Sequence, residues 1–227
     1  MLMRRSQVAF VIPAFNENAV LQETLLPLFS IGEVVVVDDG SAVTPNLEES
    51  LFDKIHFLKH SINRGQGAAL ETGFSYILQE MPNVNYVVTF DADGQHNPQD
   101  CIGMIELAES GFDVVLGSRF LTKKSEVPLL KRIVLRSFAA LYSAVRRKKI
   151  TDRHFGLRVL SRSFIESNRL TMRGYEHADE ILDMTLKGNW NYCEHPCTVN
   201  YTEYSQSKGQ PVINGLNIIF NRMIAKL

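Results

Sequence analysis

Short apolar runs alternate with helical patterns along the first half of the chain, and this alternation limits the fold more than any other feature. The runs that predict strands are residues 8–12, 33–37, 55–59, 85–90 and 113–116. The segments that predict helices between them are residues 18–30, 67–79 and 98–110. Continuous apolar strands that alternate with helices predict an α/β fold, with a mostly parallel sheet covered on both faces.

The second half of the chain is less regular. Helices are expected at residues 128–149, 161–168, 178–187 and 214–226, a loop at 151–159 and a short strand at 199–201. Since neither a repeat nor a low-complexity linker separates the halves, we expect one domain over residues 1–227. Residues 1–120 would form one half and residues 121–227 the other.

Composition excludes several classes of protein. The formal net charge of -1 gives no general attraction to nucleic acid, so no nucleic-acid partner is expected. The 3 Cys residues have no framework spacing, which favours a reduced, cytoplasmic compartment over a disulfide scaffold. The start of the chain has no signal-like segment and no run of 18 apolar residues occurs, so we expect no membrane span.

Acidic side chains follow three of the predicted strands where each strand ends. Glu17 follows the first strand, Asp39 the second and Asp91 the fourth. In open α/β sheets, ligands bind outside the carboxyl ends of the strands. The sequence therefore predicts that three acidic clusters meet at one edge of the sheet.

The segment DADGQ (91–95) is the sharpest of these signals. Residues two apart in an extended segment point to the same side, so Asp91, Asp93 and Gln95 could present oxygens to one point. Hard oxygen ligands suit Mg²⁺ or Mn²⁺. The alternative is a turn with exposed carboxylates. An EF-hand is excluded, because its twelfth position falls on Ile102 instead of Glu.

The first two loops suggest a nucleoside site. Phe15 could pack on a base, and Glu17 could accept hydrogen bonds from ribose hydroxyls; the alternative is a helix start capped by Asn16. Asp39 could bind a ribose hydroxyl or a base N–H, and the alternative there is a plain turn. Their common edge favours the binding hypothesis.

Three further segments could bind the anionic parts of a ligand. The small residues of NRGQGAA (63–69) would let backbone N–H groups approach an anion at a helix N-terminus, although a simple helix cap is the alternative. Arg119 follows the fifth strand and could bind phosphate or a sugar hydroxyl. Lys208, in a predicted loop at 205–210, could close on a diphosphate.

Two clusters in the second half have competing interpretations. Asp179 or Glu180 could act as a base toward a hydroxyl acceptor, or both could simply complement a helix N-terminus. Cys193, His195 and Cys197 suggest zinc, but a structural zinc site needs four ligands and no second cluster exists. A strand edge is the better interpretation of that segment.

Taken in order, the motifs resemble family 2 glycosyltransferases of the GT-A fold, especially the branch of dolichol-phosphate or polyprenyl-phosphate sugar synthases. The motifs are VIPAFNE (11–17), VVDDGS (36–41), NRGQGAALETGF (63–74), DADGQHNP (91–98), GSRF (117–120), DRHFGLRVLSR (152–162) and SKGQ (207–210). They cover nearly the whole chain, and the resemblance makes residues 1–120 the half that binds a nucleotide sugar and residues 121–227 the half that faces the acceptor.

The resemblance also implies roles for individual residues. Asp91 would contact nucleotide or sugar, Asp93 and Gln95 would hold the metal, and the catalytic residues would be Asp93, Asp179 and Arg119. The implied donor-binding residues are Pro13, Phe15, Glu17, Asp39, Arg64, Gly67, Asp91, Ala92, Asp93, Arg119 and Lys208.

The resemblance implies inverting transfer of a sugar from a UDP- or GDP-sugar to polyprenyl phosphate or a lipid-linked glycan, with Mg²⁺ or Mn²⁺, in the synthesis of cell-surface polysaccharides or glycoconjugates. Residues 128–149 mix apolar side chains with seven Lys or Arg, so they could lie in a membrane interface or pack on the core. A sugar-1-phosphate nucleotidyltransferase would need a Gly-rich loop where AFNE (14–17) stands. A non-catalytic binding protein is disfavoured by the intact Asp91, Asp93, Arg119 and Lys208.

Overall fold

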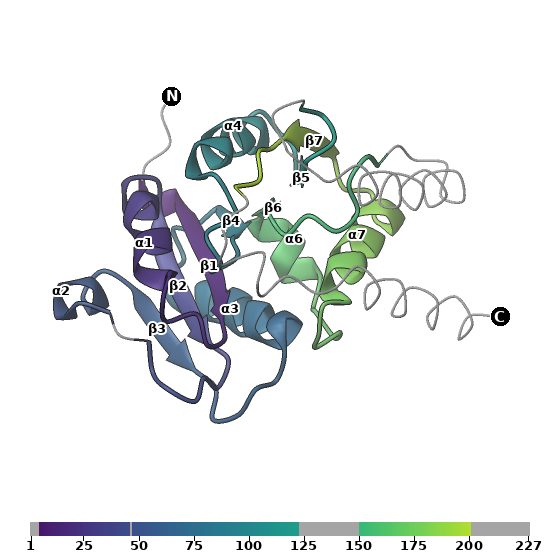
Figure 1. Cartoon of the computed structure of the whole chain (residues 1–227). Helices are drawn as coiled ribbons and strands as arrows, with labels where there is room; N and C mark the ends of the chain where they lie inside the picture. Colours follow the sequence, from purple (N-terminus) through teal and green to yellow (C-terminus); the bar gives the residue numbers. More distant parts are fainter. Residues whose placement is uncertain (1–4, 46, 123–149, 201–227) are drawn as a thin grey trace.

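The computed structural model describes residues 5–45, 47–122 and 150–200 (Figure 1). Its sheet has seven strands in the order β3-β2-β1-β4-β6-β5-β7. The strands are β1 (Val8–Ala14), β2 (Glu33–Asp38), β3 (His56–Lys59), β4 (Tyr86–Thr89), β5 (Val114–Ser118), β6 (Arg158–Ser161) and β7 (Tyr192–Pro196). Every neighbouring pair is parallel except those of β6, which runs antiparallel to β4 and β5.

Helices cover both faces of this sheet. The α-helices are α1 (Leu21–Leu25), α2 (Glu49–Phe52), α3 (Gln66–Glu80), α4 (Pro98–Glu109), α6 (Arg162–Ser167) and α7 (His177–Lys187). Short 3-10 helices are η1 (Arg5–Gln7) and η2 (Leu26–Ser30). The start of α4 follows from its sequence, because the Asn97 side chain accepts a hydrogen bond from the Gln99 N–H and proline occupies the first turn.

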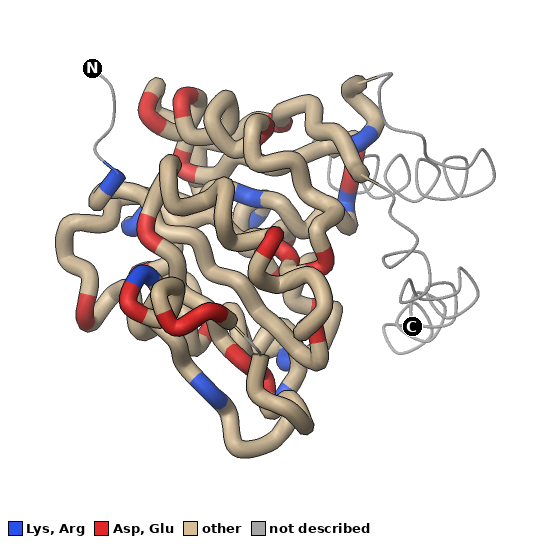
Figure 2. The backbone as a smooth tube through the Cα atoms, turned by 60° about the vertical axis from the view of Figure 1, so that its left-hand side comes forward, with Lys and Arg blue, Asp and Glu red and all other residues tan. Residues whose placement is uncertain are grey.

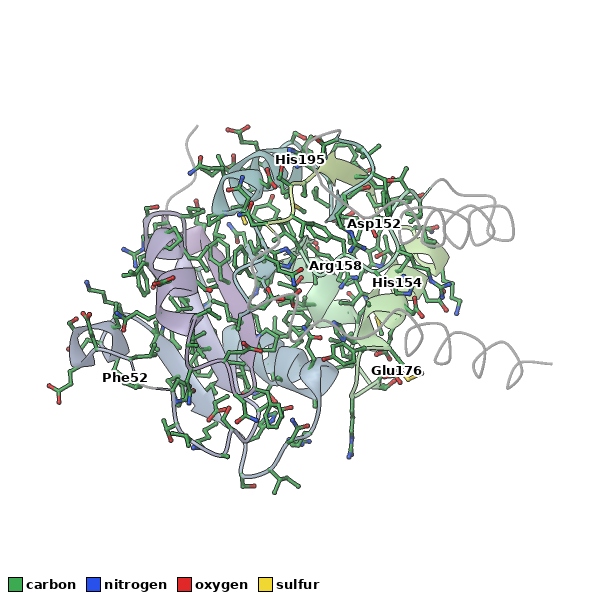
Figure 3. All side chains as sticks on the ribbon, in the orientation of Figure 1. Phe52, Asp152, His154, Arg158, Glu176 and His195 are labelled. Carbon is green, nitrogen blue, oxygen red and sulfur yellow. The ribbon has the colours of Figure 1, made fainter. Side chains whose placement is uncertain are left out.

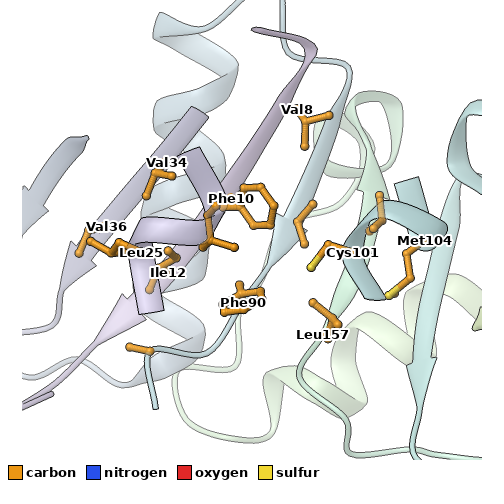
Figure 4. Close-up of a cluster of buried hydrophobic side chains, with 14 of the residues drawn as sticks. Val8, Phe10, Ile12, Leu25, Val34, Val36, Phe90, Cys101, Met104 and Leu157 are labelled. Atoms are coloured by element: carbon orange, nitrogen blue, oxygen red, sulfur yellow. The ribbon is translucent and has the colours of Figure 1, made fainter. Parts of the chain in front are cut away.

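The alternation of side chains along β1 divides the core into two layers. Phe10 and Ile12 point to the face covered by α1, η2 and α4, where they pack in one cluster with Leu25 and Met104 (Figure 4). Val11 belongs to the opposite cluster, which α3, α6 and α7 supply. Both faces are therefore buried, which explains why the strands are continuous apolar runs.

The sequence predicted most of these elements, and the differences have local causes. The helix expected at 18–30 is divided into α1 and η2, because Pro27 has no N–H to continue the α-helical hydrogen bonds. The loop expected at 151–159 ends early, since Arg158 already begins β6. Around residue 199, where a strand was expected, Val199 makes an isolated bridge with His96. The helices expected at 128–149 and 214–226 lie outside the described residues.

The direction of β6 brings a second-half segment to the important edge of the sheet. Because β6 is antiparallel, its first residue, Arg158, lies at the edge where β4 and β5 end. The strands β6 and β7 complete a sheet begun by the first half, while the assignment of one domain to all 227 residues stays a prediction. Within the described ranges, no helix is both long and apolar enough to cross a membrane.

Candidate active site

The first two loops at the carboxyl edge are joined to each other. Asn16 has a positive φ of 56°, its N–H donates to Ser41 Oγ at 2.8 Å, and its Oδ1 accepts from the Ala42 N–H at 3.1 Å. These bonds, rather than a helix cap, are the role of Asn16. Phe15 is 43% exposed beside them, whereas Pro13 is buried in β1. An exposed aromatic ring next to a fixed loop suits a base-stacking position.

Asp39 is buried and ties the second loop to the segment before α3. Its Oδ1 accepts hydrogen bonds from His60 Nδ1 at 2.6 Å and from the Arg64 N–H at 2.9 Å, and its Oδ2 accepts from the Gly65 N–H at 2.7 Å. Any contact between Asp39 and a nucleoside would come in addition to these bonds. His60, which the sequence analysis missed, therefore orients this carboxylate.

Two N–H groups in the first turn of α3 already have a carbonyl partner. The N–H groups of Gly67 and Ala68 donate to the Arg173 carbonyl oxygen at 2.8 and 3.2 Å. A Cβ on residue 67 would lie 2.1 Å from the Met172 carbonyl oxygen, so the close approach of this segment requires glycine. That Gly67 helps to bind an anion stays a prediction, and its N–H would have to exchange the Arg173 carbonyl oxygen for that anion.

Asp91 is held by the side chains of Gln66 and His96 at the end of β4. Gln66 Nε2 donates to its Oδ1 at 2.7 Å, and His96 Nε2 donates to its Oδ2 at 2.9 Å. Burial alone would raise the pKa of Asp91, but the hydrogen bond from His96 and nearby positive charge, including Arg158, lower it. A Cβ on residue 156 would lie 2.3 Å from Asp91 Oδ2, so Gly156 makes room for the ionised carboxylate.

Asp93 lies in a strongly negative environment. Its Oδ1 accepts from the Gln95 N–H at 3.0 Å, and burial together with the charge of Asp91 raises the pKa of Asp93. Glu17 raises it further. Ala92, between the two aspartates, is 3% exposed and packs in the core, so only its main chain is left for a ligand. Bringing a cation to this position would relieve the repulsion between the carboxylates.

The residues at this edge could hold a divalent metal only if a bound ligand supplied further oxygen atoms. Among the described residues, no group of three His, Cys, Asp or Glu side chains is arranged to hold a metal. Both oxygens of Asp91 already accept hydrogen bonds, so Asp91, Asp93 and Gln95 are not a preassembled set. Mg²⁺ is commonly held by one or two carboxylates with water and substrate phosphates, and Asp93 matches that mode.

Arg119 and Asp152 form a buried ion pair. Arg119 donates from Nε to Oδ2 at 2.7 Å and from Nη2 to Oδ1 at 2.8 Å, and its guanidinium lies over the rings of Phe120 and Phe155. Along the described chain, Lys and Arg residues are mostly separated from one another (Figure 2). The Arg119 guanidinium is already bonded to the Asp152 carboxylate. The predicted phosphate contact of Arg119 would have to compete with Asp152, to which the sequence analysis gave no role.

The two acidic residues of α7 have different surroundings. Asp179 accepts from Arg153 Nε at 2.7 Å, and His154 Nε2 lies 3.7 Å from the same oxygen. Glu180 instead accepts the main-chain N–H groups of residues 171–172 at 2.9 to 3.1 Å. Glu180 therefore fixes a loop, and Asp179 is the better candidate to meet an acceptor.

Side chains from the start of β6 and the loop before it complete the site. Asp152, His154 and Arg158 come from this segment (Figure 3), and Asp152 interacts electrostatically with both of the others. Burial lowers the pKa of His154, although Asp179 opposes that shift. The predicted donor-binding residue Lys208 lies outside the described residues, and Arg64 is exposed at the rim.

The sequence model of glycosyl transferase family 2 matches residues 9–169, which include the Asp39, Asp91 and Arg119 loops. The chain belongs to glycosyl transferase family 2. The resemblance seen in the sequence is thereby confirmed, and this family member is an enzyme of the glycosyltransferase class.

Relatives of this glycosyl transferase match nearly its whole length. It is 33% identical over 232 residues to an uncharacterised protein of Methanocaldococcus jannaschii, covering 99% of this chain and 94% of that protein. It is 29% identical over 243 residues to the UDP-N-acetylglucosamine–dolichyl-phosphate N-acetylglucosaminyltransferase of Methanococcus voltae, covering 97% and 96%. It is 28% identical over 228 residues to the polyprenol monophosphomannose synthase of Mycolicibacterium smegmatis, covering 92% and 81%.

Solved structures confirm the predicted GT-A fold of this glycosyl transferase. The glucosyl-3-phosphoglycerate synthase of Mycobacterium tuberculosis, in complex with Mn²⁺, UDP and phosphoglyceric acid, superimposes with a TM-score of 0.68 at 17% identity. The match covers 91% of this chain and 72% of that chain. At this identity the likeness establishes the fold alone.

Proposed function

We propose that this glycosyl transferase moves a sugar from a UDP- or GDP-sugar to a polyprenyl phosphate, with inversion at the anomeric carbon and with a divalent metal. The observation that carries the proposal is the meeting of Glu17, Asp91 and Asp93 at the carboxyl edge of the sheet, where burial and then the charges of Asp91 and Glu17 raise the pKa of Asp93. Such a cluster suits a cation shared with a diphosphate. Two relatives are named for dolichyl-phosphate and polyprenol acceptors, which supports the acceptor class.

Asp93 would hold the metal, with Gln95 beside it and phosphate oxygens completing the coordination. When bound, Mg²⁺ or Mn²⁺ would neutralise charge on the departing nucleoside diphosphate. The chain's own part is to fix that position, because the Gln95 N–H orients Asp93 and the Gln66 and His96 side chains orient Asp91. Phe15 and Glu17 would bind the nucleoside, supported by the loop that Asn16 fixes.

The acceptor decides whether a base is needed. A phosphate monoester has a second pKa of about 6, so its oxygen is largely ionised near neutral pH and can attack without losing a proton to the enzyme. Asp179 is bonded to Arg153, so in this proposal it would position the acceptor and would not take a proton. With a lipid-linked glycan, the second candidate acceptor, Asp179 would have to take a hydroxyl proton.

A polyprenyl phosphate also places the enzyme at a membrane. We propose that it works at the cytoplasmic face, with residues 128–149 in the membrane interface, in the synthesis of cell-surface polysaccharides or glycoconjugates. The seven Lys or Arg among apolar side chains support this contact. In the full-length chain, replacing these seven Lys or Arg residues with Gln should weaken the binding of the protein to anionic vesicles.

A nucleotide panel tests the proposal. Thermal unfolding is followed with UDP, GDP, UDP-N-acetylglucosamine, UDP-glucose and GDP-mannose, each with and without Mn²⁺. One nucleoside diphosphate should raise the unfolding temperature, and Mn²⁺ should enlarge the shift, because ligands that bind the folded state stabilise it. The absence of stabilisation by any nucleoside diphosphate would contradict the proposed function.

A further inference from the structure

Arg158 is a buried cation whose side chain bonds to none of the described residues. It opens β6, is 2% exposed, and pairs through its main chain with β4 and β5. Its Nη1 is buried and unbonded, and its side chain donates no hydrogen bond to any residue in the described part of the chain. Burial lowers the pKa of Arg158 to about 10, so the side chain stays charged near neutral pH. Buried N–H donors without acceptors are costly and rare.

A second arginine four residues along shows what an ordinary structural role looks like. Arg162 is also partly buried, but all its side-chain nitrogens are bonded. Its Nε pairs with Glu166 at 2.8 Å, and its Nη1 and Nη2 donate to the carbonyl oxygens of Leu78, Met81 and Val84 at 3.0 to 3.1 Å. Arg162 therefore stabilises the end of α3, whereas nothing comparable accounts for Arg158.

The carboxylates around Arg158 attract it without bonding to it. Asp91, Asp179 and Asp152 all act electrostatically on Arg158. Each accepts hydrogen bonds from other side chains, and none of the three bonds to Arg158 in the described part of the chain. Arg158 is thus a cation in negative surroundings at the carboxyl edge of the sheet, where it interacts with both Asp91 and Asp179.

The charges around Arg158 indicate which kind of ligand group it could bind. A phosphate would be repelled by three carboxylates, and a cation would be repelled by Arg158 itself. A sugar hydroxyl is neutral, and it can accept a hydrogen bond from Arg158 while donating one to a carboxylate such as Asp91. Because Arg158 is only 2% exposed, such bonds would form away from water, where they discriminate best.

Resting on the proposed function, we propose that Arg158 binds a hydroxyl oxygen of the transferred sugar and helps to determine which nucleotide sugar the enzyme uses. The role belongs to the sugar and not to the nucleoside or the diphosphate. Replacing Arg158 should therefore remove the affinity that the sugar contributes and leave the affinity for the nucleoside diphosphate unchanged.

The test compares Arg158→Met with Arg162→Met as the matched control. Dissociation constants are measured by calorimetry with Mn²⁺ for UDP and UDP-N-acetylglucosamine, and for GDP and GDP-mannose. Arg158→Met should bind the nucleoside diphosphate like the wild type and the nucleotide sugar about tenfold or more weakly, as expected for a lost hydrogen bond to a charged group. Arg162→Met should lower the unfolding temperature and change neither constant.

Three results would overturn the inference. One is an unchanged ratio of nucleotide-sugar to diphosphate affinity in Arg158→Met, another is weaker binding of the diphosphate itself, and the third is a raised KM for polyprenyl phosphate alone. If Arg158→Met does not fold, Arg158→Lys is used instead, because it keeps the charge. Arg158→Lys should change the preference between UDP-N-acetylglucosamine and UDP-glucose. A preference equal to that of the wild type would overturn the inference. Failure of the wild type to bind any of these nucleotides would defeat the proposed function instead.

Discussion

Arg119 at the end of β5 and Asp152 before β6 are joined by two side-chain hydrogen bonds of 2.7 and 2.8 Å. Their side chains are 11% and 1% exposed. The Arg119 N–H adds a third bond to the same carboxylate at 3.1 Å, and Glu194 accepts the Asp152 N–H at 3.2 Å. This pair fixes the loop after β5 against the segment that enters the site.

Asp152→Asn should destabilise the protein strongly. Removing one member of a buried ion pair leaves the other charge uncompensated, which typically costs about 3–5 kcal/mol. Denaturant unfolding at neutral pH should show a loss of that order. A loss of less than about 1 kcal/mol, the range of an exposed pair, would show that the pair is not structural.

The same pair predicts the dependence of stability on pH. Burial raises the pKa of Asp152, but the charge and hydrogen bonds of Arg119 outweigh it and hold that pKa below its ordinary value of 3.8. A lowered folded-state pKa contributes stability that is present above the ordinary value and is lost as the pH falls through the folded one. The difference in the free energy of unfolding between the wild type and Asp152→Asn should therefore become smaller below about pH 4. A difference that stays constant down to acid pH would contradict this assignment.

Gly156→Ala should damage the site more than the fold. The added methyl group would lie 2.3 Å from Asp91 Oδ2, so the carboxylate must move away from its hydrogen bond with His96. We expect kcat/KM to fall about tenfold or more, since one charged hydrogen bond is disturbed, while the unfolding temperature changes little. His96→Phe, which keeps the ring and removes the bond, should reproduce the defect. Wild-type kinetics in both variants would mean that Asp91 needs no positioning.

Asp93→Asn tests the metal position. The substitution removes the carboxylate whose pKa is raised by burial and by the neighbouring negative charges, so the site loses its preference for a cation. Turnover should fall about 100-fold or more, the range seen when an electrostatic contact in the transition state is lost. Added Mn²⁺ should no longer increase the thermal shift given by the nucleoside diphosphate. A metal response equal to that of the wild type would place the metal elsewhere.

Asp179→Asn distinguishes a phosphate acceptor from a hydroxyl acceptor. General-base catalysis contributes about 100-fold or more, whereas an ionised phosphate needs no base. We therefore expect kcat to fall less than about tenfold, with Glu180→Gln as the control for losing one charge at the same helix end. A loss of 100-fold or more in Asp179→Asn alone would indicate a hydroxyl acceptor and a base at this position.

The fold could be predicted because most of its strands are continuous apolar runs in the sequence. The apolar runs of β1, β2, β4 and β5 are buried on both faces, and this burial is why they lack polar alternation. The strand β6 was not predicted, because Arg158 interrupts its apolar run and a charged residue in a strand ordinarily argues against burial.

The site was predictable in its location and less so in its contacts. Strand ends placed Glu17, Asp39 and Asp91 at one edge, because parallel strands end together. Pairing between distant segments was not visible from the sequence. The Arg119 pair joins residues 33 apart, and the Arg173 carbonyl reaches the start of α3 from far along the chain. Such partners are chosen by tertiary packing.

Transfer of labelled sugar to a lipid phosphate tests the central claim most directly. The wild type is incubated with polyprenyl phosphate, Mn²⁺ and radiolabelled UDP-N-acetylglucosamine or GDP-mannose, and label in the organic phase is counted beside Asp93→Asn. We predict a labelled polyprenyl-phosphate sugar with one of the donors, formed by the wild type and nearly absent with Asp93→Asn. A wild type that binds the donor tightly but transfers no label to polyprenyl phosphate would contradict the account.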